Sequence, residues 1–299
     1  MSRPRVSVIT IFLDEERFLA EAIESVRAQT FADWELILVD DGSRDGSAEI
    51  ARVCADSDPD RIRCLHHPGR TNRGMSASRN LGLAEARGEL VAFLDGDDVW
   101  LPDKLADQVA IMDAEPRAAL VYGRTLIWHG WQAAPTAADF HYALGVEPDR
   151  LYEPPVLFNV LMRNRAQTPT TCNAMMRRTL VERVGGFVDA FRGMFEDQVF
   201  FAKALLAAPA YVDHRTWAKY RQHDASCSGR APALAHELRA RLRFLSWLRG
   251  YVAAAGAVPA SARLAMARAV LDTRLRIART TLRSALGTVI GDTQRFGGA

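Results

Sequence analysis

Short apolar runs alternate with amphipathic segments along the first 125 residues of the chain. Runs typical of strands cover residues 6–12, 34–39, 61–66, 90–94 and 118–122. In the segments between them, apolar side chains recur at helical spacing, starting near residues 18, 45, 72 and 102. Because strands and helices alternate over short connections, the pattern predicts an α/β fold with a doubly wound, mainly parallel sheet and helices on both faces.

The alternation breaks down between residues 128 and 165, where prolines interrupt every long element and aromatic side chains are frequent. Strands are expected again at 170–176 and 211–220, with a helix that begins at Glu196 between them. Residues 231–299 are helical in character, and Pro259 is expected to separate two helices. An apolar stripe on the second of these helices consists of Leu271, Leu275, Ala278, Leu282, Ala285 and Val289.

The net charge of +2 conceals a strong asymmetry. Residues 231–299 hold 11 arginines, no lysine and 3 acidic residues, a net charge of +8, so the rest of the chain carries −6. A basic tail on an acidic body suggests that the tail meets something negative: a membrane surface, nucleic acid or the body itself.

The composition also bears on the cellular compartment. No apolar stretch reaches the length that spans a bilayer, and no signal-peptide core precedes the first strand. The 4 cysteines show no CxxC spacing, so neither a zinc site nor a disulfide framework is indicated. We therefore expect a cytoplasmic protein, with peripheral contact at the inner face of the membrane as an extension of that expectation.

Three carboxylates follow the apolar run 90–94 within four residues, at Asp95, Asp97 and Asp98. Clustered carboxylates repel one another and are costly to desolvate, so such a group usually serves a cation. At the carboxyl end of a strand in an α/β sheet, that cation would carry a phosphate-bearing substrate. The alternative is a polar turn that caps the strand before the next helix. No GxGxxG or GxxxxGK[ST] motif is present, which argues against a dinucleotide-binding or P-loop site.

Five motifs occur in a fixed order along the chain. They are Val6-Ser7-Val8-Ile9-Thr10, Asp14-Glu15-Glu16, Val39-Asp40-Asp41-Gly42-Ser43, Asn72-Arg73-Gly74 with Arg79-Asn80, and Asp95-Gly96-Asp97-Asp98. Together they resemble the family 2 glycosyltransferases of the GT-A fold over about residues 6–223. The resemblance implies transfer of a sugar from a nucleotide-sugar donor with inversion. One departure is Ile11, where such proteins commonly have proline.

The resemblance also implies roles for the donor-side residues. Asp97 matches the metal-binding aspartate of the DxD motif, and Asp95 its partner near the ribose and the metal, which would be Mn²⁺ or Mg²⁺. Asp41 matches the aspartate that recognises the nucleotide base, typically uracil. Thr10 and Glu15 match positions that line the nucleoside pocket. For Asp98 a structural cap of the following segment is an equal alternative, and for Asp40 an Asx-type turn before Gly42 is favoured.

Further residues match less specific features of the family. Arg79 could contact phosphate in a bidentate manner, or it could form an ion pair. Glu196 and Asp197 match the ED pair, and we expect Asp197 to be the general base and Glu196 to orient the acceptor. The alternative for this pair is capping of a helix N-terminus. His223 resembles a histidine that serves some relatives as a further metal ligand, although an isolated histidine is usually no ligand.

On this reading, residues 1–125 form the nucleotide-sugar-binding half, 126–230 the acceptor-binding and catalytic-base half, and 231–299 a basic helical extension. Three aromatic residues of the acceptor half could stack on a sugar or be core residues, namely Trp128, Trp131 and Tyr142. No QxxRW sequence follows the ED pair, which indicates transfer of single sugars. Family habit favours a UDP-sugar donor, a carbohydrate or lipid-linked acceptor, and a role in cell-surface polysaccharide or glycolipid synthesis, with no nucleic-acid partner.

Two other classes of function are weighed against this one. A sugar-nucleotide pyrophosphorylase would need a Gly-rich basic loop after the first strand, where the sequence has Phe12-Leu13-Asp14-Glu15-Glu16. A non-catalytic module could bind polyanions or a membrane through its arginine-rich tail. For that tail we expect the apolar stripe to pack on the body or on a second subunit, with Arg276, Arg279 and Arg283 facing solvent or anionic lipid. A simple solvated helical face is the alternative.

Overall fold

The computed structural model describes residues 3–135, 137–223, 234–254, 256 and 258–295, without the side chains of 282–295. The chain divides into two compact units, Met1–His223 and Asp224–Ala299. The division lies near the expected start of the tail at residue 231. The boundary expected at 125/126 falls inside the first unit, and the assignment of its two halves stays a prediction.

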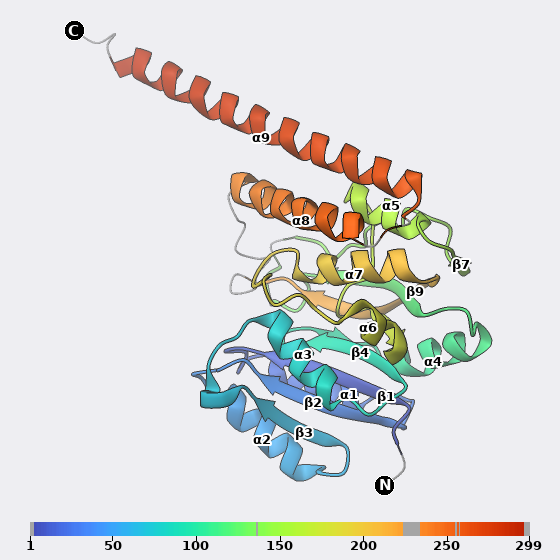
Figure 1. The fold of residues 1–299 in the computed structure, drawn as a ribbon. Coiled ribbons are helices and arrows are strands. Elements are labelled where there is room, and N and C mark those ends of the chain that lie inside the picture. Colours follow the sequence, from blue (N-terminus) through green and yellow to red (C-terminus); the bar gives the residue numbers. More distant parts are fainter. Residues whose placement is uncertain (1–2, 136, 224–233, 255, 257, 296–299) are drawn as a thin grey trace. The chain divides into compact units, whose positions relative to one another are not determined.

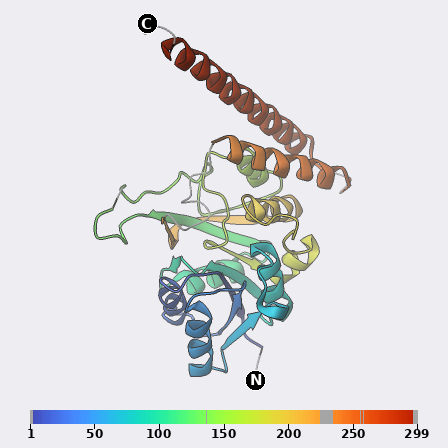
Figure 2. The ribbon, with the colours of Figure 1, turned by 90° about the vertical axis from the view of Figure 1, so that its left-hand side faces the viewer.

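The first unit is built on one nine-stranded sheet (Figure 1 and Figure 2). Its strands are β1 (Val6–Phe12), β2 (Trp34–Asp40), β3 (Ile62–His66), β4 (Leu90–Asp95), β5 (Val99–Trp100), β6 (Leu120–Trp128), β7 (Arg150–Tyr152), β8 (Ala174–Arg177) and β9 (Ala210–Arg221). The order of neighbours is β3-β2-β1-β4-β8-β6-β9-β5, and β7 also pairs with β9. Strands β3, β2, β1 and β4 are parallel, as predicted, whereas β8 runs antiparallel to both β4 and β6.

Helices cover both faces of the sheet, which confirms the predicted doubly wound arrangement. They are α1 (Leu19–Arg27), α2 (Ser47–Ser57), α3 (Met75–Glu85), α4 (Lys104–Ala114), α5 (Val156–Arg163), α6 (Arg178–Val184) and α7 (Glu196–Ala207), with the short 3₁₀ helix η1 (Pro68–Arg70). One core joins α1, α2 and α4 to the sheet face that carries Val8 and Leu36. On the other face α3 approaches so closely that a Cβ on Gly82 would lie 2.5 Å from Ile9 Cγ2, so only glycine fits there.

The register of the central strands sets the position of the site. Ile11 of β1 pairs with Val39 of β2 on one side and with Asp95 of β4 on the other. The carboxyl ends of these three parallel strands are therefore level. The polar residues that follow each strand come together at one edge of the sheet, next to the point where the chain crosses from β3 back to β4.

The second unit consists of two helices, α8 (Leu234–Ala254) and α9 (Ala260–Arg295), which pack against each other. Pro259 stands between them, as predicted. In the described part of the apolar stripe Leu271 is 58% and Leu275 48% exposed, and the packing of this stripe on the body or on a second subunit stays a prediction. The buried side of α9 is a different one, formed by Ala262, Met266, Ala269 and Thr273. Residues 282–289 of the stripe lie outside the described side chains. Among the helices that the structure describes, none combines the length and the apolar composition needed to cross a membrane.

Candidate active site

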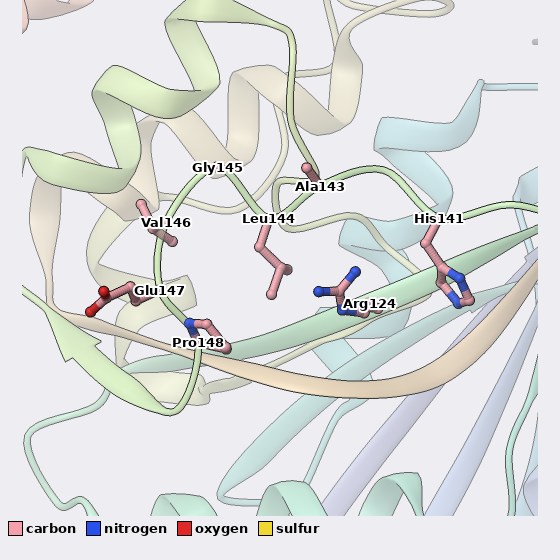
Figure 3. Close-up of a pocket in the computed structure, with 8 residues that line it drawn as sticks. All are labelled: Arg124, His141, Ala143, Leu144, Gly145, Val146, Glu147 and Pro148. Atoms are coloured by element: carbon pink, nitrogen blue, oxygen red, sulfur yellow. The ribbon is translucent and has the colours of Figure 1, made fainter.

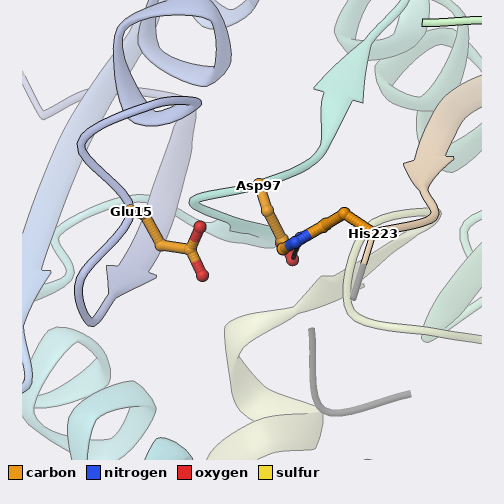
Figure 4. Close-up of side chains that lie close together, drawn as sticks. All are labelled: Glu15, Asp97 and His223. Carbon is orange, nitrogen blue, oxygen red and sulfur yellow. Dashed lines mark hydrogen bonds and ion pairs between the residues drawn. The ribbon is translucent and has the colours of Figure 1, made fainter. Parts of the chain in front are cut away.

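Three side chains from distant parts of the sequence converge at the carboxyl edge of the sheet. Glu15 follows β1, Asp97 follows β4 and His223 follows β9, and their ligating atoms all lie within 4.8 Å of one another. Figure 4 shows the imidazole of His223 against the carboxylate of Asp97, with the carboxylate of Glu15 directed toward both. The His223 Nε2 to Asp97 Oδ2 distance is 3.0 Å.

The short strand β5 explains how His223 reaches this position. Val99 and Trp100 directly follow the acidic cluster and pair antiparallel with Lys219 and Ala218 of β9. Strand β9 thus runs back past the cluster, and the residues after its end lie beside Asp97.

The electrostatics of this group favour a cation. Burial, and next the negative charges of Asp97 and Asp95, raise the pKa of Glu15 to about 8. Two carboxylates and one imidazole are a donor set that suits Mn²⁺ and related divalent ions. A bound cation would relieve the repulsion that raises the pKa of Glu15, so these residues fit a divalent metal.

A buried arginine connects the acidic cluster to the ED pair. Arg79 of α3 is 1% exposed, and it donates from Nη2 to Asp95 Oδ1 at 2.7 Å and from Nη1 to Glu196 Oε1 at 3.1 Å. The second oxygen of Asp95 accepts a hydrogen bond from Thr171 Oγ1 at 2.8 Å. Both oxygens of Asp95 thus have protein partners. The group with ligating atoms within 4.8 Å of one another contains Glu15 together with Asp97 and His223, and metal ligation by Asp95 stays a prediction.

The ED pair, Glu196 and Asp197, begins α7, and the pKa values of both carboxyl groups are raised. Burial, and next the charge of Asp197, raise the pKa of Glu196 to about 7, while Arg79 opposes the rise. Burial also raises the pKa of Asp197, against the lowering effects of Arg79 and of the Gln198 backbone N–H, which donates to Asp197 Oδ1. Both carboxyl groups thus have pKa values above those of ordinary carboxyls, which brings their proton exchange closer to neutral pH, as an acid–base site requires.

The residues expected at the nucleoside pocket are in varied surroundings. Asp41 accepts backbone hydrogen bonds from Arg73 and Gly74, and so holds the loop before α3. Asp40 Oδ1 accepts from the backbone of Gly42 and Ser43, which confirms the expected Asx-type turn. Thr10 is 1% exposed, and its hydroxyl has no hydrogen-bond partner among the described residues. The nucleotide contacts of Thr10 and Asp41 stay predictions.

Arg221, at the end of β9, is a site component for which sequence reasoning gave no role. Its Nε donates to the carbonyl oxygen of Asp97 at 2.8 Å, and its Nη2 donates to Glu21 Oε2 at 2.5 Å. Its backbone N–H donates to Asp98 Oδ1 at 3.0 Å, so Asp98 has a structural role. In the sequence, Arg221 shows only as a basic residue two positions before His223. Its role follows from the pairing of β5 with β9, which the sequence does not reveal.

Aromatic rings enclose Arg221. Its guanidinium carbon lies 4.5 Å from the ring centroid of Trp128, 4.7 Å from that of Phe18 and 5.3 Å from that of Trp131. Trp131 also donates from its indole N–H to the carbonyl oxygen of Gln222. Of the three aromatic residues expected at the acceptor site, Trp128 and Trp131 thus contact Arg221. Through Arg221 they support the segment with Asp97 and Asp98, which we call the metal-side loop. Tyr142 is 51% exposed.

Solved structures share this fold. TarS of S. aureus (residues 1–349), in complex with UDP-GlcNAc, superposes with a TM-score of 0.62 at 19% identity, covering 81% of this chain and 66% of that one. The mannosyltransferase PcManGT from Pyrobaculum calidifontis, in complex with GDP-Man and Mn²⁺, gives a TM-score of 0.59 at 18% identity, over 99% and 82% of the two chains. These likenesses confirm the expected GT-A fold.

Sequence comparison identifies the family. EpsE of Bacillus subtilis (strain 168) is 44% identical over 112 residues, which cover 38% of this chain and 40% of EpsE. The match therefore spans less than half of that relative. The model of Glycosyl transferase family 2 matches residues 7–185, which contain the five motifs apart from Val6 and most of the sheet. The chain belongs to glycosyl transferase family 2.

Proposed function

We propose that this protein is a metal-dependent, inverting glycosyltransferase that moves a single sugar from a nucleotide-sugar, with UDP-sugars favoured, to a hydroxyl acceptor. The observation that carries the proposal is the group formed by Glu15, Asp97 and His223, with ligating atoms within 4.8 Å of one another at the carboxyl edge of the sheet. A nucleotide-sugar complex of TarS and a GDP-Man and Mn²⁺ complex of PcManGT, two proteins of the same fold, support it.

Glu15, Asp97 and His223 would hold the divalent cation. A bound Mn²⁺ or Mg²⁺ would act as a Lewis acid on the diphosphate leaving group as the glycosidic bond breaks. Arg221 donates to the carbonyl oxygen of Asp97 and so holds the backbone from which the Asp97 carboxylate projects. In this scheme Asp95 orients the ribose side of the site while Arg79 and Thr171 hold it in place.

Asp197 would be the general base. Inversion requires attack on the anomeric carbon from the face opposite the leaving group, with one base to remove the proton of the acceptor hydroxyl. Glu196 is bonded to Arg79, whereas Asp197 is partly exposed and keeps one oxygen without a partner among the described residues. Asp197 is thus the better placed of the two to accept a proton.

Arg79 is better explained as a positioning residue than as a phosphate ligand. It is 1% exposed and already bonded to Asp95 and Glu196. By tying the donor-side aspartate to the base-bearing helix, it would fix the distance between the anomeric carbon and the acceptor hydroxyl.

The finer assignments rest on the family. They are a carbohydrate or lipid-linked acceptor, a role in cell-surface polysaccharide or glycolipid synthesis, a cytoplasmic location, and peripheral membrane contact or self-association through α8 and α9. The family match and the acidic site make a pyrophosphorylase or a purely polyanion-binding module the weaker proposals.

Thermal unfolding with UDP, GDP, dTDP and CDP, each with Mn²⁺, Mg²⁺ or EDTA, tests the proposal. One nucleotide–metal pair should raise the melting temperature, because a ligand of the folded state stabilises it by mass action. Asp97→Ala should abolish the shift, and Asp60→Ala, which removes an exposed carboxylate of the same kind, should keep it. No shift with any pair, or equal shifts in the two variants, would contradict the proposal.

A further inference from the structure

A separate pocket lies on the acceptor half of the first unit. It is formed between strand β6 and the segment 141–148, and it has a volume of about 720 Å³. Figure 3 shows Arg124 of β6 reaching into it beneath the chain at Leu144 and Gly145, with His141 at one end and Glu147 at the other. We call it the Arg124 pocket.

The guanidinium of Arg124 is the main polar group of this pocket. Arg124 is half-buried, and the structure contains no hydrogen bond or ion pair from its side chain to any described residue. A guanidinium offers five donors in a planar fork, which matches the two oxygens of a carboxylate or phosphate. An arginine held in a pocket without an acceptor is therefore ready to receive an anion.

The neighbouring groups leave this positive charge uncompensated. His141 accepts from or donates to Thr216 Oγ1 through Nε2 at 3.0 Å. Burial, and next the charge of Arg124, lower the pKa of His141. The carboxylate of Glu147, at the far end, is paired with Arg150 Nη1 at 3.1 Å. The carboxylate of Glu147 is thus already paired, and His141 supplies no negative charge. The positive charge of Arg124 is therefore not neutralised at the opening of the pocket.

The position of the pocket relative to the metal group identifies which substrate could use it. Arg124 and Trp128 are four residues apart on β6, and Trp128 pairs with Arg221, which donates to Asp97 of the metal group. Four residues of strand span about 13 Å. Arg124 therefore lies well back along β6 from the residues that support the metal group, which suits contact with a remote part of an extended acceptor rather than with the donor diphosphate.

We propose that the Arg124 pocket binds an anionic group of the acceptor, a carboxylate or a phosphate, one or more units away from the hydroxyl that receives the sugar. This inference rests on the proposed function, since it assigns the acceptor class of the same enzyme. The anion lies in the fork of Arg124 beside His141, and the sugar body packs on Leu144, Val146 and Pro148. The enzyme thereby selects acidic glycans or phosphate-bearing acceptors over neutral ones.

An amide NMR titration in EDTA tests the pocket without donor or metal. The probes are glucuronate for the carboxylate class, inorganic phosphate for the phosphate class, and glucose as the neutral control. The amide of Gly145 should shift saturably with at least one anionic probe and not with glucose. The apparent affinity of the protein for that anion should fall about tenfold in Arg124→Gln, because this variant loses a charge-assisted hydrogen-bonded pair. Arg52→Gln, the same change at an exposed arginine of α2 that does not line the pocket, should leave it unaltered.

The outcomes separate clearly. A response to glucuronate alone identifies acidic sugars, and a response to phosphate alone identifies phosphate-bearing acceptors. No saturable shift with either anion in the wild-type protein, or equal losses in Arg124→Gln and Arg52→Gln, would overturn the proposal. Metal-dependent nucleotide stabilisation of the wild-type protein tests the proposed function separately, because that measurement needs no acceptor. Its failure beside a positive titration would leave an anion site on a protein of another activity.

Discussion

Glu196 and Asp197 are neighbours in sequence but have different surroundings. The carboxylate of Glu196 is bound by Arg79, while that of Asp197 accepts a hydrogen bond from the Gln198 backbone at the start of α7. The role of each therefore depends on which oxygen can face an incoming hydroxyl. This difference gives two predictions for catalysis.

Replacing Asp197 by asparagine should abolish its action as base and leave the donor site intact. We expect transfer to fall by about 10²–10⁴-fold, with unchanged metal-dependent stabilisation by the nucleotide. Asp189→Asn is the control, because it removes a carboxylate of the preceding loop that is bonded to Asn80. Turnover assays with the nucleotide-sugar would contradict the assignment if both variants lost activity equally.

The pair should also set the pH dependence of the reaction. A base acts only when ionised, and burial raises the pKa of Glu196 to about 7 and raises that of Asp197. The rate should therefore increase with pH on the acid side and level off above about pH 7. In Glu196→Gln, Arg79 loses one of its two carboxylates and acts more strongly on Asp197, so the acid limb should move to lower pH. A pH–rate profile without an acid limb would argue against this pair as the titrating groups.

Lys104 is a fully buried lysine of α4 whose charge is unfavourable for folding. Burial lowers its pKa to about 7, and the partners of its ammonium group among the described residues are Gln108 Oε1 at 2.7 Å and the ring of Trp100. The unfolded chain keeps a lysine pKa of about 10.4, so it binds more protons than the folded state between about pH 7 and pH 10. Stability should rise with pH across this window, and the deficit is fully present below it.

Lys104→Met should therefore raise the free energy of unfolding near neutral pH, by at most on the order of 4 kcal/mol, and should flatten its rise with pH. Urea unfolding near about pH 7 and about pH 9 measures both effects. Lys219→Met is the matched control, since this lysine also lies on a tryptophan ring, that of Trp128, but is partly exposed. A variant that is less stable at both pH values would refute the argument.

Strand β5 has only two residues, yet its pairing with β9 builds the metal-side loop. Arg221 completes that loop through Asp97 and Asp98, so it should act on metal affinity rather than on the base. We expect Arg221→Met to weaken Mn²⁺ binding about 10–100-fold, as for other residues that orient ligands. Arg17→Met is the control, because Arg17 lies on the same ring of Trp131 at 4.8 Å. Metal titrations followed by nucleotide stabilisation should separate the two.

The predictability of the elements follows from their length and burial. The strands β1 and β2 and the helices α1, α3 and α4 carry long apolar patterns, and they occur within one to three residues of where the sequence placed them. Strands β5 and β7 are two and three residues long and exist through pairing with β9, which no local pattern encodes. The helices α5 and α6 lie in or after the irregular stretch, where prolines and short connections mask their period.

The site was predictable in composition more than in arrangement. Its acidic motifs could be placed at strand ends from their order alone, but the partner of each carboxylate depends on strand register and on α3. The metal group joins Glu15 to Asp97, 82 positions later, and to His223, 208 positions later, and Asp95 is bonded to Arg79 and Thr171, 16 and 76 positions away. Sequence spacing carries no information about which oxygen of a carboxylate is already bonded.

The charge asymmetry of the chain coincides with an exposed face of its last helix. Leu264, Leu271 and Leu275 are each about half exposed, and Arg268 and Arg279 lie on the same side of α9 at helical spacing. Leucines bordered by arginines are the pattern of a helix that lies in a membrane interface. Residues 231–299 also carry a net charge of +8, which would attract anionic lipid.

We therefore expect the full-length chain to co-sediment with vesicles that contain phosphatidylserine and to remain in solution with purely zwitterionic vesicles. Binding should weaken as salt is raised, because exposed charges are screened over about 8–10 Å. Replacing Leu264, Leu271 and Leu275 by serine should reduce binding through lost apolar burial, and replacing Arg268 and Arg279 by glutamine should reduce its salt dependence. Exposed Arg52 and Arg61 of the first unit, changed to glutamine, give a charge-matched control. Equal sedimentation of all three variants and the wild-type chain would exclude the membrane role and leave self-association through this face, which light scattering of the leucine variant would then decide.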